Sequence, residues 1–354
     1  MHLKLMEDGV IIFRRMALLL IFAMISGCSE PIDVQPEDAI PLWHLQPNPV
    51  LVFMSKSDAP EGELYLLEKD SSITRLTYND RHENNPALSP DSTKVAFHAG
   101  DPLDMLTWEI VVLDLVTGEE IQITDNRVLD GHPDWSPDGS RLVYGSFSDA
   151  DGNPAGAADI VVISLDGTGF TRLTDSPWED NDPEWSPDGT KIAFKSTRLT
   201  QEHAREEIFV MNADGSQVQR LTTTSSWQSD HDPSWSPDSS TIAFSRFEGE
   251  RRWTDIANVD ILLEHWRELM PWNIYTVDLS GKVEAITDGV GAAGLPVFAD
   301  DGSGILYLYF EFITDGDRIT GADHQLLLFD VLGEDVQPLI PLSDHAPTLE
   351  YYDW

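Results

Sequence analysis

The chain has 354 residues, of which 41% are hydrophobic, so it is long enough for one large domain or two ordinary domains with a substantial core. It carries 62 Asp and Glu against 22 Lys and Arg, a formal net charge of -40. Such a surface repels nucleic-acid phosphates and anionic lipid headgroups, so we expect no nucleic-acid partner. It favours solubility, cations or basic partners.

Residues 1–27 are predicted to be a lipoprotein signal peptide. Arg14 and Arg15 precede a short apolar run at 16–25, which is too short to span a bilayer stably. The run ends at Ile25-Ser26-Gly27-Cys28, which resembles a bacterial lipobox, where cleavage precedes a cysteine that becomes lipidated. Cys28 is the only cysteine in the sequence, so no disulfide can form within it. The alternative is a plain secretory or uncleaved segment.

Residues 28–47 are predicted to form a lipid-anchored flexible tether, because they contain four prolines among acidic residues. Ser29 follows Cys28 in place of the aspartate that is associated with retention in the inner membrane. We therefore expect a protein on the periplasmic side of the envelope, at the outer membrane, that contacts the membrane through its lipid only.

Residues 48–354 contain a repeat of about fifty residues. In its clearest copy, Pro183 marks the start of a strand, because proline lacks an amide hydrogen. Trp185 is large enough to fill the space between two packed sheets, and Pro187-Asp188-Gly189 is typical of a tight turn before the next strand. The prolines that mark the successive copies are Pro86, Pro133, Pro183, Pro233, Pro296 and Pro347.

Each repeat continues with two further strands, and four strands per repeat are typical of a propeller blade. The first repeat begins at a second strand, 50–55, and the last one ends on a first strand, 347–354. Joining these two parts completes a blade and leaves no open sheet edge. We therefore predict an all-β, six-bladed β-propeller of four-stranded blades, in which the N-terminal strands plus the C-terminal strand close the last blade.

The Pro-x-Trp-Ser-Pro-Asp-Gly repeats at 133–139 and 183–189, with partial copies at 86–91 and 233–238, resemble the β-propeller repeats of the TolB family. The resemblance covers residues 48–354, but no counterpart of the smaller α/β domain that precedes the propeller in TolB proteins is recognised. It implies protein–protein recognition at the propeller mouth in the periplasm, with no reaction catalysed. The partner would be an envelope protein, either basic or peptidoglycan-associated.

The Ser and Asp of the repeat motif are interpreted as turn residues, whereas the loops that lead to the central tunnel carry histidines and carboxylates. Imidazoles beside carboxylates suit a transition metal, and the same groups suit a basic peptide. The alternative is a polar, water-filled rim, because no two of these residues have the spacing of a helical metal motif. The metal candidates are His82, His132, His231 and His345. The candidates for contact with a partner are Asp180, Asp182, Asp230 and His231.

Two loops between second and third strands alternate acidic residues in the manner of a calcium loop. The match is imperfect, because Pro154 replaces the expected glycine, and Ile160 and Ile319 occupy ligand positions. A solvated hairpin is the alternative. We expect no cofactor besides the covalent lipid on Cys28, with calcium or another divalent cation as the alternative. The candidate ligands are Asp149, Asp151, Asn153 and Asp159 in one loop, and Asp315, Asp317 and Asp323 in the other.

A helical insertion is predicted at 250–271, where apolar residues recur at intervals of three and four. Thr254 or Asp255 can cap the helix and Pro271 ends it. The apolar stripe either packs on the propeller as a lid or docks a partner. Its residues are Trp253, Ile256, Val259, Leu263, Trp266 and Met270.

An enzymatic function is disfavoured, because the sequence contains no Gly-x-Ser-x-Gly elbow of a hydrolase. The alternative function is a divalent-metal-dependent propeller enzyme such as a polysaccharide lyase, with the four histidines as ligands. Such an enzyme needs basic residues to hold an acidic polysaccharide, and the tunnel loops offer only Arg81 in negative surroundings. We therefore predict a non-catalytic cell-envelope lipoprotein whose propeller mediates protein–protein interaction.

Overall fold

A computed structural model describes residues 49–55, 62–68, 72–101, 103–148, 154–198, 205–225, 228–249, 272–287, 292–299, 302–315, 318–330, 335–340 and 351–353. The regular elements in these ranges are β-strands. No helix in the same ranges is long and apolar enough to cross a membrane. The predicted signal peptide, the tether and the helical insertion at 250–271 lie outside them, so these stay predictions.

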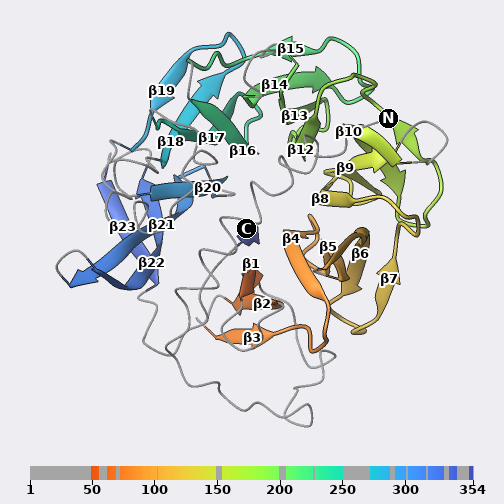
Figure 1. Ribbon diagram of the computed structural model, residues 1–354, viewed down its shortest axis with the longest axis horizontal. Helices are drawn as coiled ribbons and strands as arrows, with labels where there is room; N and C mark the ends of the chain where they lie inside the picture. Colours follow the sequence, from red (N-terminus) through yellow and green to blue (C-terminus); the bar gives the residue numbers. More distant parts are fainter. Residues whose placement is uncertain are drawn as a thin grey trace, which may run out of the picture.

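The strands form a ring of sheets around a central axis (Figure 1). One strand from each repeat lies innermost in the ring, and these strands begin near the marker prolines. They are β4 (His82–Leu88), β8 (Asp130–Trp135), β12 (Asp180–Trp185), β16 (Ser229–Trp235), β20 (Ala292–Phe298) and β24 (Tyr351–Asp353).

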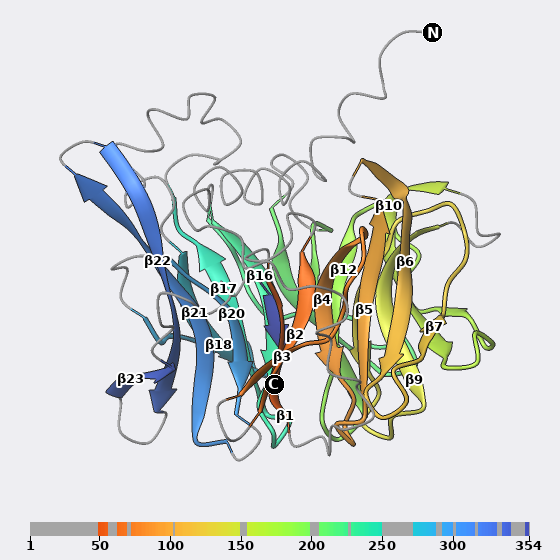
Figure 2. The ribbon, with the colours of Figure 1, turned by 90° about the horizontal axis from the view of Figure 1, so that it is seen from below.

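The other strands follow outward, antiparallel to their neighbours within a repeat, and run along the axis in the side view (Figure 2). Second strands are β1 (Pro49–Ser55), β5 (Lys94–Asp101), β9 (Arg141–Ser148), β13 (Lys191–Ser196), β17 (Thr241–Phe247) and β21 (Gly304–Asp315). Third strands are β2 (Glu63–Glu68), β6 (Asp104–Asp114), β10 (Pro154–Ser164), β14 (Glu207–Asn212), β18 (Trp272–Asp278) and β22 (Arg318–Asp330). Fourth strands are β3 (Ile73–Arg75), β7 (Glu120–Gln122), β11 (Thr171–Arg172), β15 (Gln219–Arg220), β19 (Val283–Ala285) and β23 (Asp335–Ile340).

The prediction of six blades is wrong: among the described residues the strands form five sheets, four of four strands and one of eight. The eight-stranded sheet arises because β18 and β20 pair in parallel at Trp272 and Ala292. Strand β20 begins Ala292-Ala293-Gly294, and such small residues allow two backbones to approach closely. The repeat pattern does not show whether neighbouring edges are hydrogen bonded, so it divides this one sheet into two.

The ring is closed by the two ends of the described chain. Strand β24 pairs antiparallel with β1, with Phe53 opposite Tyr352 and Met54 opposite Tyr351. The first sheet therefore has the order β24-β1-β2-β3, and β1 has a hydrogen-bonded neighbour on each side.

The hydrophobic core lies between neighbouring sheets, and tryptophans of the repeat motif fill part of it. Trp135 is 4% exposed and packs with Ala87 and Ile110 of the preceding sheet and with Leu142 of its own. Its indole Nε1–H donates to the Ala87 carbonyl oxygen at 2.9 Å. Trp185 and Trp235 occupy the corresponding positions in the next two clusters.

The motif's Ser and Asp serve the turn, as the sequence predicted. Ser186 Oγ donates to Asp188 Oδ1 at 2.7 Å, and the same oxygen accepts the Thr190 amide N–H at 2.9 Å. Gly189 has a φ of 73°, which a residue with a side chain rarely adopts. In the copy at 136–140, bonds from Ser136 and Ser140 lower the pKa of Asp138 to about 2.

Candidate functional site

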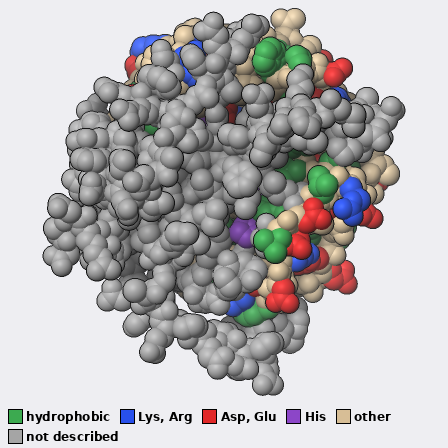
Figure 3. Space-filling view, in the orientation of Figure 1, with side chains coloured by type: hydrophobic (Ala, Val, Ile, Leu, Met, Phe, Trp, Pro, Cys, Tyr) green, Lys and Arg blue, Asp and Glu red, His purple; other side chains and the backbone are tan. Residues whose placement is uncertain are grey.

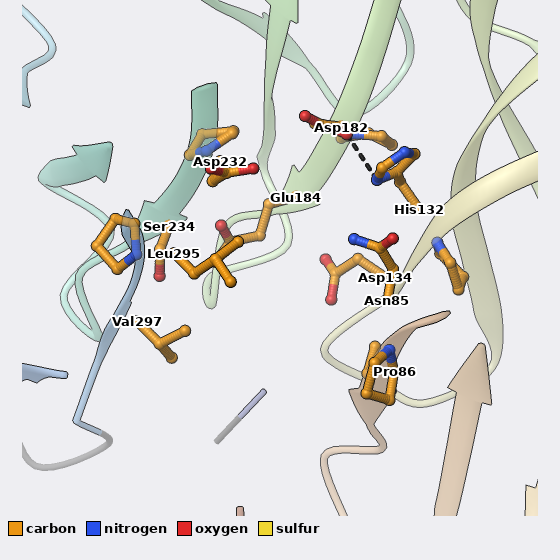
Figure 4. Close-up of a pocket in the computed structure, with 15 residues that line it drawn as sticks. Asn85, Pro86, His132, Asp134, Asp182, Glu184, Asp232, Ser234, Leu295 and Val297 are labelled. Carbon is orange, nitrogen blue, oxygen red and sulfur yellow. Dashed lines mark ion pairs between the residues drawn. The ribbon is translucent and has the colours of Figure 1, made fainter. Parts of the chain in front are cut away.

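A cavity of about 140 Å³ lies on the axis of the ring. Three consecutive residues from each of five innermost strands line it, with the marker proline in the middle of each triplet. Figure 4 shows side chains from these strands around the same space. The lining residues are Asn85–Ala87, His132–Asp134, Asp182–Glu184, Asp232–Ser234 and Leu295–Val297.

The residue before each of these five marker prolines has a left-handed backbone conformation. The φ values are 47° at Asn85, 56° at His132, 50° at Asp182, 51° at Asp232 and 53° at Leu295. Asn and Asp tolerate this conformation better than most residues, whereas a branched leucine is unusual there. The strand pairing is irregular at the same places, which is where a β-bulge re-aims side chains.

Acidic side chains of the cavity wall also connect neighbouring sheets. Asp134 Oδ2 accepts the backbone N–H of Trp185 at 2.6 Å, and Glu184 Oε1 accepts the N–H of Trp235 at 2.9 Å. These bonds fix both carboxylates on a rigid frame. With Asp182 and Asp232 they give the wall four carboxylates, and the described lining residues include no Lys or Arg.

A network of charged side chains extends from the cavity wall into the ring. His132 Nδ1 lies 2.7 Å from Asp182 Oδ1, and Lys195 Nζ lies 2.9 Å from Asp182 Oδ2. Lys195 also lies 3.8 Å from a carboxylate oxygen of Glu206, which is 3.3 Å from His231 Nε2. Two carboxylates therefore share one buried lysine, and each also contacts a histidine.

Glu179 adds to the negative charge of this network. Burial raises its pKa to about 7; the charge of Lys195 acts in the opposite direction, whereas Glu206 and Asp182 raise the pKa further. At neutral pH this carboxyl is therefore partly protonated. The region behind the cavity wall contains more carboxylates than it can ionise together, which is the environment that a cationic group would neutralise.

Aromatic rings lie beside His132. The imidazole rings of His132 and His98 have centroids 5.5 Å apart, and Trp108 lies between His98 and His82 with centroid distances of 4.9 and 5.2 Å. His98 Nδ1 accepts the backbone N–H of His132 at 3.2 Å, which fixes His98 relative to the cavity wall. In Figure 3 a histidine side chain is visible near the centre of the ring.

Two of the acidic residues predicted to contact a partner are fully buried in ion pairs. Asp180 and Asp230 have no exposed surface. Asp180 accepts a bond from Ser196 Oγ at 2.5 Å and pairs with Arg198, and Asp230 binds both Nε and an Nη of Arg246 at 2.6 and 2.8 Å. The sequence shows that acids recur before the marker prolines but does not show which of them face inward. Of the candidates, Asp182 lines the cavity and His231 lies in the network behind it.

The described histidines are not brought to a common point. His132 contacts Asp182, His231 contacts Glu206 and the Trp272 ring, and His82 contacts the Trp108 ring. Among the described residues no three His, Cys, Asp or Glu side chains are arranged to hold a metal ion. His345 lies outside these residues.

The proposed calcium loops are only partly described. Asp159 faces its own blade: Arg172 lies 3.0 Å from one oxygen, and Thr174 Oγ1 donates to the other at 2.9 Å. Asp315 and Asp323 lie in the long hairpin β21–β22. In the strand register, Asp315 lies opposite Arg318 and Asp323 lies opposite Glu311. The remaining ligands and the partner-binding residues of the insertion lie outside the described residues. These are Asp149, Asp151, Asn153, Asp317, Trp253, Ile256, Val259, Leu263, Trp266 and Met270.

Sequence reasoning missed Lys195, Glu206 and His98. Lys195 and His98 sit in second strands, inside the runs Lys191–Ser196 and Lys94–Asp101, which are otherwise mostly apolar at their buried positions. A charged or imidazole side chain in such a run is a usable signal, because a buried charge needs a partner. Glu206 precedes β14 and gives no comparable pattern.

Comparison with known proteins shows which protein family the chain resembles. Residues 103–271 match the family model described as the TolB beta propeller domain. An uncharacterized protein of Agrobacterium fabrum is 32% identical over 91 residues, which are 25% of this chain and 29% of that protein. The match therefore spans less than a third of the relative's length.

Solved structures share the fold. TolB from Acinetobacter baumannii superposes with a TM-score of 0.59 at 18% identity, over 85% of this chain and 65% of that one. A putative TolB from Agrobacterium tumefaciens gives 0.51 at 24% identity, over 68% and 81%. An oligogalacturonate lyase from Vibrio parahaemolyticus gives 0.54 at 16% identity, over 84% and 75%. With the family model, these similarities identify a TolB-like propeller.

Proposed function

We propose that this TolB-like propeller is a non-catalytic recognition module of the cell envelope, which binds a cationic segment of a protein partner at the axial cavity. The observation that carries the proposal is the wall of that cavity. It has carboxylates from three adjacent strands, β8, β12 and β16, and no Lys or Arg among its described residues. Complementary charge of this kind steers association and selects the partner.

The site is preorganised. The cavity residues sit on strands rather than on loops, at bulges fixed by prolines, and Asp134 and Glu184 are held by backbone N–H groups of the next sheet. A partner's lysine or arginine can therefore bind without reordering of the wall, which keeps the entropic cost of association low.

The proposal is tested by crosslinking in intact cells with a photoreactive residue at Val297, an uncharged residue of the cavity wall. We expect a discrete protein adduct at this position. With the partner purified, Asp232→Asn weakens binding about tenfold, because one charge is lost from a partly enclosed site, and added salt weakens wild-type binding. Asparagine keeps the left-handed backbone that position 232 needs.

The matched control places the photoreactive residue at Asp214, which is exposed in the turn between β14 and β15. No adduct is expected there. Equal adducts at both positions would mean that the cavity is not the binding surface. Unchanged affinity after Asp232→Asn combined with Glu184→Gln would show that its charge has no role.

The envelope location belongs to the same proposal and rests on the lipobox-like sequence that ends at Cys28. We expect the wild type to incorporate a labelled fatty acid and Cys28→Ala to incorporate none, because the residue that carries the lipid is gone. Labelling of growing cells followed by immunoprecipitation of the protein measures this, with Cys28→Ser as a second variant. A wild-type protein that takes up no label would disprove lipid anchoring at Cys28.

A further inference from the structure

Four junctions between successive repeats contain the same pair of buried acids. One acid lies in the third strand of a repeat and the other lies in the innermost strand of the next repeat. The eight carboxyl-bearing residues are at most 6% exposed. The pairs are Glu63 with Glu83, Glu109 with Asp130, Asp159 with Asp180, and Glu207 with Asp230.

Arginines neutralise three of these four pairs. In each of the three, one guanidinium binds the first acid and another binds the second. The ion pairs are Arg75–Glu63 and Arg81–Glu83, then Arg172–Asp159 and Arg198–Asp180, and finally Arg220–Glu207 and Arg246–Asp230.

The pair of Glu109 and Asp130 differs, because within the described residues neither forms an ion pair. Gln122 occupies the position, two residues before a threonine, at which Arg75, Arg172 and Arg220 stand. Ser146 lies opposite Asp130 in the strand pairing, as Arg246 lies opposite Asp230.

Four neutral donors surround the Glu109 and Asp130 carboxyls. The Asn126 backbone N–H donates to Glu109 Oε1 at 2.7 Å, and Thr124 Oγ1 donates to Oε2 at 2.6 Å. Ser146 Oγ and Asn126 Nδ2 donate to the two oxygens of Asp130 at 2.5 and 2.7 Å. Neutral donors stabilise a carboxylate less than a guanidinium does, so two negative charges in this place are costly.

Other titratable groups nearby do not supply the missing charge. Asp125 raises the pKa of Glu109, and the buried Tyr144 faces both carboxyls with its own pKa raised by burial. Arg127 is exposed and lies 3.8 Å from Asp104 instead. Burial raises the pKa of Glu109 to about 7 against the bonds from Thr124 and Asn126, and it raises that of Asp130 as well.

We propose that the junction between the β4–β7 and β8–β11 sheets is a pH-operated seam. Glu109 and Asp130 share a proton there, and loss of this proton loosens the junction. Because the folded state binds this proton more tightly than the unfolded chain, its stabilising effect is full below about pH 4.5 and is lost as the pH rises through about 7. Asp130 lies two residues before His132, so the seam couples pH to the cavity wall. The inference does not depend on the proposed function.

The test is hydrogen exchange measured by mass spectrometry at pH 6 and pH 8 on the full chain. The peptide 106–130 reports this seam, and the peptide 158–174, which ends before Glu179, reports the corresponding seam with arginines. After correction for intrinsic exchange, we expect protection in 106–130 to fall about tenfold more than in 158–174. Exchange must be measured peptide by peptide, because burial also raises the pKa of Glu83, in a neighbouring junction, to about 7. A measurement of overall stability would not separate the two groups.

Two variants test the cause. Glu109→Gln removes the titrating group, and its amide can accept from the Asn126 N–H and donate to Thr124. Gln122→Arg supplies the missing arginine at an exposed position, where a longer side chain fits without disturbing the fold. We expect each variant to abolish the difference between the two peptides. Equal pH responses of both peptides in the wild type, or a wild-type difference retained in either variant, would overturn the proposal.

Discussion

Asp230→Ala is expected to lower the free energy of unfolding by about 3–5 kcal/mol, because it leaves a buried guanidinium without its counter-ion. Asp230 has no exposed surface and binds Arg246 through two bonds of 2.6 and 2.8 Å. Arg246 also stacks over the rings of Phe244 and Tyr275, so its side chain cannot easily turn to solvent. Urea unfolding followed by circular dichroism measures the loss.

The control for Asp230→Ala is the double variant with Arg246→Met, which removes both charges. Since a buried ion pair contributes little net stability relative to apolar groups of similar size, the double variant should recover most of the loss. A single variant that costs less than about 1 kcal/mol would contradict the structural role of the pair. Any loss of partner binding in Asp230→Ala is then a folding defect, not evidence of a contact.

Trp235→Ala is expected to cost about 3–5 kcal/mol of unfolding free energy. Trp235 is 3% exposed and packs with Val210 and Leu221 of one sheet and Ile242 of the next. Its indole N–H donates to the Glu184 carbonyl oxygen at 3.2 Å. Removing the indole opens a cavity between two sheets. These sheets cannot move closer to fill it, because the other blades of the propeller hold them in place.

Trp235→Phe separates packing from hydrogen bonding. Phenylalanine keeps most of the buried area and loses the indole donor, so the expected cost is about 1–2 kcal/mol. Chemical denaturation of both variants beside the wild type provides the comparison. Equal costs for Ala and Phe would mean that the hydrogen bond, and not the volume of the ring, dominates.

The fold was largely predictable from sequence, because the repeat combines independent local signals. The tryptophan fills the core and the Pro-Asp-Gly turn leads to the next strand, and both recur at 133–139 and 183–189. The expectation that the proline marks the strand start is wrong: Pro183 lies inside β12, which begins at Asp180, at an irregularity of the strand pairing. The number of separate blades was not predictable. It depends on the backbone pair between Trp272 and Ala292, which leaves no periodic pattern.

The site was predictable only in part. The sequence shows that His132 and Asp182 precede marker prolines, and both line the cavity. It does not distinguish Asp182 from Asp180, two residues earlier, whose side chain is buried beside Arg198. Strand alternation alone would put both on the same side, but the bulge at the proline breaks that alternation, and only the folded backbone reveals the direction of each.

The pairing of β24 with β1 also determines when the first sheet can be completed during synthesis. About 300 residues separate the two strands, so the inner edge of β1 has no neighbour until those residues have been made. At a synthesis rate of roughly 5–20 residues per second, that interval is about 15–60 s. During it, strands β1–β3 present an unpaired apolar edge that another chain can join. Ring closure therefore becomes available long after β1–β3 have been made, and these early strands must be kept apart from other chains until then.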